Sequence, residues 1–316
     1  MHRIFEDGPK RDRRLWIGDL RLQALANYYT FNNIELVKRC LYLFAAADTS
    51  KQGILPGYIY ENPCFVSGYW FLQDYALLYG VCVCDYYLYT KDKDTFLELY
   101  PIVKSQFEAV FAELDSDGIV AVPNAGDVFV DWSDSLSKIT AMQGIYLYAL
   151  DIVYNVLKEI NHEDCGLFKK MYDNGLEAAK KVLYDENSNS FANERDGFQE
   201  SVHSVIWMIL AGVIKGEKAK ALLMSVLKSK ETIKLCTPYA NHYLVEAMLK
   251  LDMKKEAFDH IKYYWKSMID LGADTFFEMH IPGMPDFAPD CGHYLFNSMC
   301  HAWSCTPTYF IRKYME

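Results

Sequence analysis

The segment EDGPKRDRRLWIGD, from Glu6 to Asp19, contains three aspartates, Asp7, Asp12 and Asp19, at spacings of five and seven residues. Basic residues, Gly-Pro and one tryptophan, Trp16, stand between them. A charged stretch of this kind alone is typical of a solvated loop at the entry to a helix. This one runs directly into an apolar periodic stretch, which would place Asp19 near a core face, where an unpaired carboxylate is costly. Carboxylates in costly positions are typical of sites for acid–base chemistry.

The rest of the chain is a series of amphipathic helical patterns. Apolar residues recur at intervals of three or four residues, as expected for helices with one buried face. Between the first two patterns, Asn32 or Asn33 is suited to cap the second helix. Convincing alternating strands are absent, apart from short extended pieces such as 118–122 and 127–130. The expected helices number eleven and cover 20–29, 34–44, 70–89, 95–114, 139–160, 164–184, 199–213, 215–227, 238–251, 254–271 and 301–314.

The connections between these helices alternate between short turns and longer loops that contain glycine, proline and aromatic residues. Two helical architectures fit this pattern, an open superhelix of hairpins and a closed ring of hairpins. A superhelix should show a repeating sequence motif, and none is present. We therefore expect an all-α fold, an (α/α)6 toroid of the six-hairpin glycosidase type. Its longer loops, at 52–69 and 115–135, would gather at one end as the functional face.

An ideal toroid of six hairpins has twelve helices, whereas this sequence predicts eleven. We therefore expect that the first helix of the toroid is lacking and would lie upstream of Met1. On this interpretation residues 1–316 form a single but incomplete catalytic domain.

Composition argues against several classes of partner. The formal net charge is −10 and no basic stripe is present, which argues against nucleic acid or an anionic membrane surface. No apolar run reaches the length of a membrane span. The nine cysteines form an odd, scattered set, which indicates reduced thiols, and Cys82 and Cys84 lack zinc-ligand spacing. Because no signal peptide is present at Met1, we expect a cytoplasmic protein. We also expect no cofactor and no metal. The sequence does not indicate its oligomeric state.

Three stretches of the chain resemble motifs of glycoside hydrolase family 78, the α-L-rhamnosidases. Residues 7–19 resemble the signature D-C-P-x-R-E-R-x-G-W-x-G-D, residues 273–278 (ADTFFE) resemble A-T-T-x-W-E, and residues 297–304 (NSMCHAWS) resemble N-x-x-H-x-x-x-S. The three occur in the family's order and span nearly the whole chain. The β domains that flank the toroid in this family are missing from the sequence.

The resemblance implies inverting hydrolysis of terminal α-L-rhamnosides. In that reaction a protonated carboxyl group donates to the leaving oxygen, and a carboxylate on the opposite face of the sugar activates water. The resemblance assigns the general acid to Asp12 and the general base to Glu278. It also implies a carbohydrate partner, bound by side chains that include Asp7, Arg11, Trp16, Asp19, Trp132 and His301. For Trp132, where the family often has G-D-W, packing within its loop is an equally good explanation.

The signature departs from the family at the acid itself. Asp12 replaces a glutamate and is shorter by roughly 1.5 Å, and a displacement of about 1 Å can lower a rate on the order of a hundredfold. We favour a backbone set closer to the sugar over a poor acid. Gly8 in place of cysteine and Leu15 in place of glycine also indicate a divergent branch.

Three alternative functions fit parts of the sequence. One is an inactive sugar-binding relic, which the substitution at Asp12 would favour. Another is a different toroid glycosidase such as an unsaturated uronyl hydrolase, whose acidic substrate would call for a basic pocket. The third is a helical interaction scaffold, which would not need carboxylates in its pocket.

Overall fold

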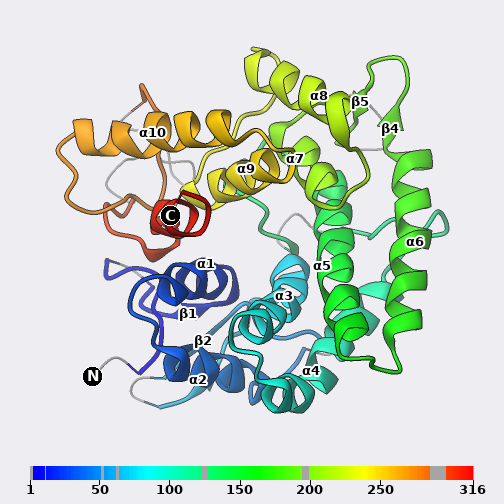
Figure 1. Ribbon diagram of the computed structural model, residues 1–316, viewed down its shortest axis with the longest axis vertical. Coiled ribbons are helices and arrows are strands. Elements are labelled where there is room, and N and C mark those ends of the chain that lie inside the picture. Colours follow the sequence, from blue (N-terminus) through cyan, green and yellow to red (C-terminus); the bar gives the residue numbers. More distant parts are fainter. Residues whose placement is uncertain are drawn as a thin grey trace. The chain divides into compact units, whose positions relative to one another are not determined.

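The computed structural model describes residues 3–10, 12–50, 53–61, 64–122, 127–193, 199–284 and 297–315. In this part of the chain there are eleven α-helices, the number expected from the sequence. They are α1 (Ile17–Tyr28), α2 (Ile34–Ala45), α3 (Gln73–Thr90), α4 (Lys93–Ala112), α5 (Ile139–Glu159), α6 (Cys165–Val182), α7 (Val202–Leu210), α8 (Gly216–Lys228), α9 (Pro238–Lys250), α10 (Lys254–Asp270) and α11 (Pro307–Tyr314) (Figure 1).

The helix boundaries follow local chemistry. Of the two candidate caps for α2, Asn33 is the one used, and its side chain accepts a hydrogen bond of 3.2 Å from the backbone N–H of Leu36. The expected helix start at Trp70 is wrong, because the Trp70 carbonyl accepts a hydrogen bond from Gly57 N–H and α3 is capped at Leu72. The expected start at His301 is also wrong, because α11 begins at Pro307, a residue well suited to the first helical position.

The chain forms two compact units. The first unit contains Met1–Ala109, Thr237–Tyr239 and Ile261–Glu316, and the second unit contains Val110–Cys236 and Ala240–His260. In the first unit, α1 packs against α3, α11 and a 3-10 turn at Ala302–Ser304. In the second unit, α5 packs against α6 and α7, and α7 packs against α8. The first unit is therefore built from both ends of the chain.

Two small antiparallel sheets accompany the helices. The first has the order β1 (Leu15–Trp16), β2 (Tyr58–Tyr60), β3 (Val66–Ser67), and it pairs Trp16 with Tyr58. The guanidinium carbon of Arg14 lies 4.4 Å from the Tyr58 ring centroid and 4.7 Å from that of Tyr60, which adds a cation–π contact. This sheet anchors the end of the 7–19 segment. The second sheet pairs β4 (Tyr184–Asp185) with β5 (Ser190–Phe191).

The extended pieces expected from the sequence are not strands. Residues 118–122 contribute only an isolated bridge between Val120 and Leu114, and the described residues 127–130 form no strand.

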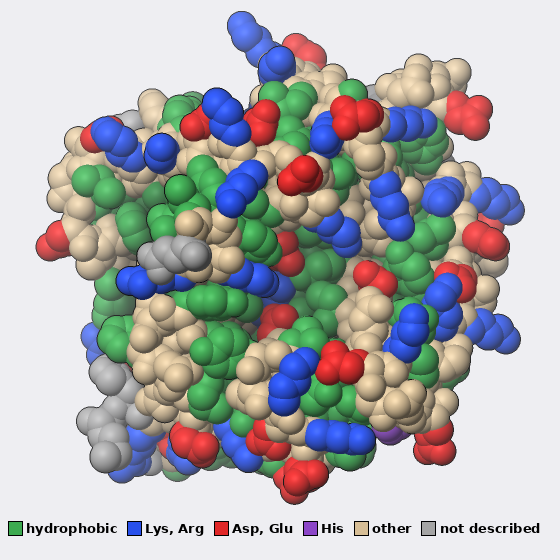
Figure 2. All heavy atoms as spheres, viewed as in Figure 1, with side chains coloured by type: hydrophobic (Ala, Val, Ile, Leu, Met, Phe, Trp, Pro, Cys, Tyr) green, Lys and Arg blue, Asp and Glu red, His purple; other side chains and the backbone are tan. Residues whose placement is uncertain are grey.

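The surface carries charges of both signs. On the face shown in Figure 2, Lys and Arg side chains are interspersed with Asp and Glu side chains. Among the described residues, no helix is both long enough and apolar enough to cross a membrane. The eight described cysteines are all free.

Candidate active site

The 7–14 loop is closed by hydrogen bonds at Asp7. Asp7 N–H donates to the Arg14 carbonyl at 2.9 Å, and Arg14 N–H donates to Asp7 Oδ1, also at 2.9 Å. From the other end of the chain, Ala302 N–H donates to the Asp7 carbonyl at 2.7 Å. The Asp7 carboxylate is thus fixed, and the first motif is joined to the last.

Two glycines in the signature make room for close packing. A Cβ atom on Gly8 would lie 3.1 Å from His301 Cδ2 and 3.2 Å from the Cys300 carbonyl oxygen. A Cβ atom on Gly18 would lie only 2.6 Å from Cζ of the Tyr75 ring. Gly18 therefore lets α1 begin directly against Tyr75.

Residues from all three motifs line one recess in the first unit. It has about 160 Å³ of empty volume, including space open to solvent. Asp12 and Glu278, the expected acid and base, both line it. The full lining consists of Asp7, Gly8, Asp12, Glu278, Ser298 and His301.

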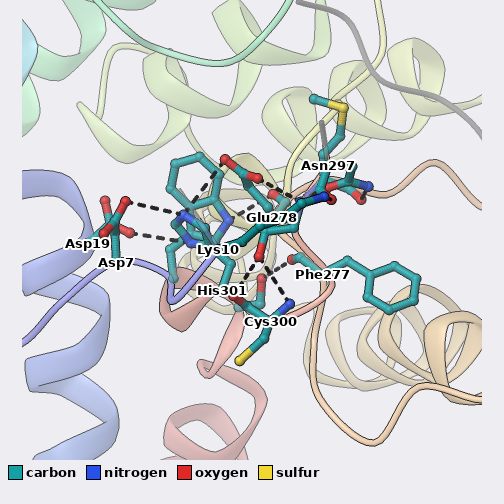
Figure 3. Close-up of polar contacts among 12 residues, drawn as sticks. Asp7, Lys10, Asp19, Phe277, Glu278, Asn297, Cys300 and His301 are labelled. Carbon is teal, nitrogen blue, oxygen red and sulfur yellow. Dashed lines mark hydrogen bonds and ion pairs between the residues drawn. The ribbon is translucent and has the colours of Figure 1, made fainter. Parts of the chain in front are cut away.

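His301 lies among three carboxyl groups. Its Nε2 atom is 3.9 Å from Asp7 Oδ2 and 3.9 Å from Glu278 Oε1, and its Nδ1 atom is 3.5 Å from Asp19 Oδ1. Figure 3 shows Asp7 and Asp19 on one side of the imidazole and Glu278 on the other. The ring also packs on Trp303, with 4.3 Å between centroids. His301 therefore links the signature to the glutamate.

The Glu278 carboxylate is held through one of its oxygens. Ser298 N–H donates to Glu278 Oε2 at 2.9 Å, and Glu278 N–H donates to the Ser298 carbonyl at 2.7 Å. Only 4% of Glu278 is exposed. The other oxygen, Oε1, is the one near His301.

Burial of several acids together raises their pKa values. Burial raises the pKa of Asp7 to about 6 even though backbone N–H groups stabilise its charge. Burial raises the pKa of Asp19 well above its usual value, and the negative charges of Asp7 and Glu278 raise it further. Asp7 and Asp19 therefore hold their protons to higher pH than free aspartates do.

Two tryptophans expected at the site, Trp16 and Trp132, are not among the residues that line this recess. Trp16 is buried against Tyr58, Trp70 and Tyr75, at centroid distances of 4.6, 6.0 and 6.2 Å. Trp132 belongs to the second unit, where it is half-buried and packs edge-on against Phe129. Arg11 lies outside the described residues.

Sequence reasoning missed two functions of the last motif. It did not identify Ser298 as the donor to Glu278, because that contact uses the backbone N–H. It also missed Lys10, whose Nζ donates to the Asn297 carbonyl at 2.6 Å and ties the signature loop to the last motif (Figure 3). The position of Asn297 and Ser298 in that motif was the available signal. Within the described ranges, no group of three or more His, Cys, Asp or Glu side chains forms a metal site.

A family model described as the bacterial alpha-L-rhamnosidase 6 hairpin glycosidase domain matches residues 1–315. The chain belongs to this family, and its fold is the all-α six-hairpin glycosidase fold. The family expected from the three sequence motifs is therefore confirmed.

Solved structures agree with this assignment. A rhamnosidase from Klebsiella oxytoca with rhamnose bound is 38% identical, with a TM-score of 0.94, and the match covers 100% of this chain and 61% of that one. A GH78 family rhamnosidase of Bacillus sp. GL1 is 23% identical, with a TM-score of 0.82 and coverage of 96% and 32%. This chain thus spans only part of the length of both rhamnosidases.

A more distant match shares the fold alone. A GH63 mannosylglycerate hydrolase from Thermus thermophilus is 10% identical, with a TM-score of 0.72 and coverage of 97% and 95%. None of the curated proteins compared with the chain matches it.

Proposed function

We propose that this domain hydrolyses terminal α-L-rhamnosides with inversion at the anomeric carbon, with Asp12 as general acid and Glu278 as general base. The observation that carries the proposal is the recess that both carboxyl groups line, although they come from opposite ends of the chain. The 38% identical Klebsiella oxytoca rhamnosidase, with rhamnose bound, supports the choice of sugar.

In the proposed reaction, Asp12 donates its proton to the glycosidic oxygen as the bond from that oxygen to the anomeric carbon breaks. A water molecule attacks the anomeric carbon from the opposite face and passes a proton to Glu278. The products are rhamnose of inverted configuration and the free alcohol. Proton exchange with solvent then restores both carboxyl groups.

The other residues would bind the sugar. Asp7 and His301 line the recess with hydrogen-bonding groups suited to sugar hydroxyls, and Asp19 lies beside His301. A protonated Asp19 would donate to a hydroxyl oxygen, whereas an ionised carboxylate would accept from a hydroxyl group. We assign a sugar contact also to Arg11, as the first motif implies, but not to Trp16, which packs among aromatic rings. An abundance of carboxyl groups disfavours the acidic sugar of an unsaturated uronyl substrate.

The test is hydrolysis of a panel of nitrophenyl glycosides, including the α-L-rhamnoside, and of an unsaturated uronide. We expect turnover of the rhamnoside. We also expect Glu278→Gln and Asp12→Asn to lose at least about a hundredfold in kcat, while still binding rhamnose in calorimetry. Rhamnose binding without turnover by the unaltered chain would indicate a relic. Full activity of Asp12→Asn would overturn the assignment of the acid.

A further inference from the structure

The segment that carries Glu278 accepts hydrogen bonds from the last motif along its whole length. We call residues 276–279 the base segment and residues 297–304 the clamp segment. All four carbonyls of the base segment accept a hydrogen bond from the clamp segment. The donors are His301 N–H to Phe276 O (2.9 Å), Ser304 Oγ to Phe277 O (2.5 Å), Trp303 Nε1 to Glu278 O (2.8 Å) and Asn297 Nδ2 to Met279 O (2.8 Å).

Two backbone N–H groups of the base segment also donate to the clamp segment. Glu278 N–H donates to the Ser298 carbonyl at 2.7 Å, and Met279 N–H donates to Asn297 Oδ1 at 3.2 Å. Asn297 thus binds both polar groups of the Met279 backbone through one side-chain amide. The base segment has neither helix nor strand, so the clamp segment supplies the hydrogen bonds that regular structure would otherwise provide.

Four of these contacts use side chains, and they come from three residues. Asn297, Trp303 and Ser304 are all buried. A carbonyl that loses its donor in such a place stays unsatisfied unless the backbone shifts, so the segment is expected to move when one of these side chains is truncated. None of the three is needed to provide a proton or a charge to the reaction.

We propose that Asn297, Trp303 and Ser304 are positioning residues that set the location of the Glu278 carboxylate. They fix the Glu278 backbone so that Ser298 N–H meets Oε2, while Oε1 stays beside His301 at the recess. This inference rests on the proposed role of Glu278 as general base. A carboxylate displaced by about 1 Å activates water poorly, at a loss on the order of a hundredfold in rate.

The test compares Asn297→Ala and Ser304→Ala with a matched control, Thr275→Val. Thr275 Oγ1 donates to the Met299 carbonyl at 2.5 Å, so the control removes a hydrogen bond between neighbouring parts of the same two stretches, at an exposed position. The measurements are kcat and KM on the nitrophenyl α-L-rhamnoside, the Kd for rhamnose and the melting temperature. We expect kcat to fall by about tenfold to a hundredfold in both alanine variants. KM and Kd should stay within about threefold, and the control should retain its kcat.

A double-mutant cycle separates positioning from general loosening of the fold. If Asn297 acts through Glu278, adding Asn297→Ala to Glu278→Gln should lower the residual kcat by less than about twofold. If Asn297→Ala lowers kcat as much in the Glu278→Gln variant as in the unaltered chain, the proposal is overturned. Should the alanine variants fail to fold, Trp303→Phe serves instead. It removes one donor while keeping a ring against His301 and Tyr239, and unchanged kcat would count against positioning.

The outcomes distinguish this inference from the function on which it rests. If the unaltered chain turns over no rhamnoside, the proposed function fails and the positioning role fails with it. If the unaltered chain is active, and folded Asn297→Ala and Ser304→Ala keep kcat within about twofold, only the positioning role is overturned.

Discussion

At the scale of single residues, the aspartate at position 12 sets the most specific expectation. Asp12 lines the recess although it is shorter than the glutamate of the family signature. If the backbone is placed for the shorter side chain, Asp12→Glu would push the carboxyl group too far. We predict that kcat on the rhamnoside falls roughly tenfold to a hundredfold. Steady-state kinetics would show this, and a variant faster than the unaltered chain would identify Asp12 as a poor acid.

Asp7 gives a prediction for stability against pH. Its pKa is about 6 in the folded state against 3.8 as the reference value, so between those pH values the folded chain binds more protons than the unfolded chain. The free energy of unfolding therefore falls as pH rises through this window, by at most about 3 kcal/mol, and stays lowered above it.

Asp7→Asn should remove this contribution while keeping an oxygen that accepts from Arg14 N–H. We predict that the variant is more stable than the unaltered chain at pH 7 and that the difference shrinks towards pH 4. Urea unfolding at several pH values measures it. A variant less stable at pH 7 would show that the Asp7 charge is well stabilised in the fold.

Gly18 gives a prediction for packing. A methyl group there would overlap the Tyr75 ring. We predict that Gly18→Ala lowers the free energy of unfolding by about 1–3 kcal/mol. Gly166→Ala is the matched control in α6, because a Cβ atom there would meet nothing within 4 Å. Urea denaturation of both variants tests this, and equal midpoints would show that Tyr75 moves aside freely.

At the scale of elements, periodicity predicted which segments are helical but not where each helix begins. The number of α-helices and the cap at Asn33 followed from spacing and from local hydrogen bonding. The starts at Trp70 and His301 did not, because each of these residues is held outside a helix by a backbone hydrogen bond to a distant segment, Gly57 or Phe276. Periodicity carries no information on such long-range pairing.

A buried hydrogen bond between Asp131 and His203, at the start of α7, gives a prediction at this scale. Asp131 Oδ2 lies 2.7 Å from His203 Nε2 and accepts from Cys236 N–H at 2.8 Å, and both side chains are fully buried. Asp131 thus links the loop before α5, helix α7 and the segment before α9.

We predict that His203→Ala lowers the free energy of unfolding by about 1–3 kcal/mol, because it removes one hydrogen-bond partner of the buried Asp131 carboxyl group. Chemical denaturation measures the change. Lys255→Ala, which removes an exposed partner of Asp259, serves as control and should shift the midpoint little. A small effect of His203→Ala would mean that Asp131 is sufficiently stabilised by backbone donors.

At the scale of the whole molecule, the three motifs predicted that residues from both ends of the chain meet, and four of the named residues do lie together. Asp7, Asp12, Glu278 and His301 line one recess because the first unit combines both ends of the chain. The sequence did not predict the clamp on Glu278, because its contacts involve backbone groups whose partners depend on the fold. It also did not predict that Trp16 is packed away among aromatic rings.

The central claim is that Asp12 and Glu278 act on the two faces of one sugar. The most direct test is the configuration of the first product, followed by proton NMR during hydrolysis of a nitrophenyl α-L-rhamnoside by the unaltered chain. The account predicts that β-L-rhamnose appears first and that the α anomer grows in later by mutarotation. Initial release of the α anomer would contradict it.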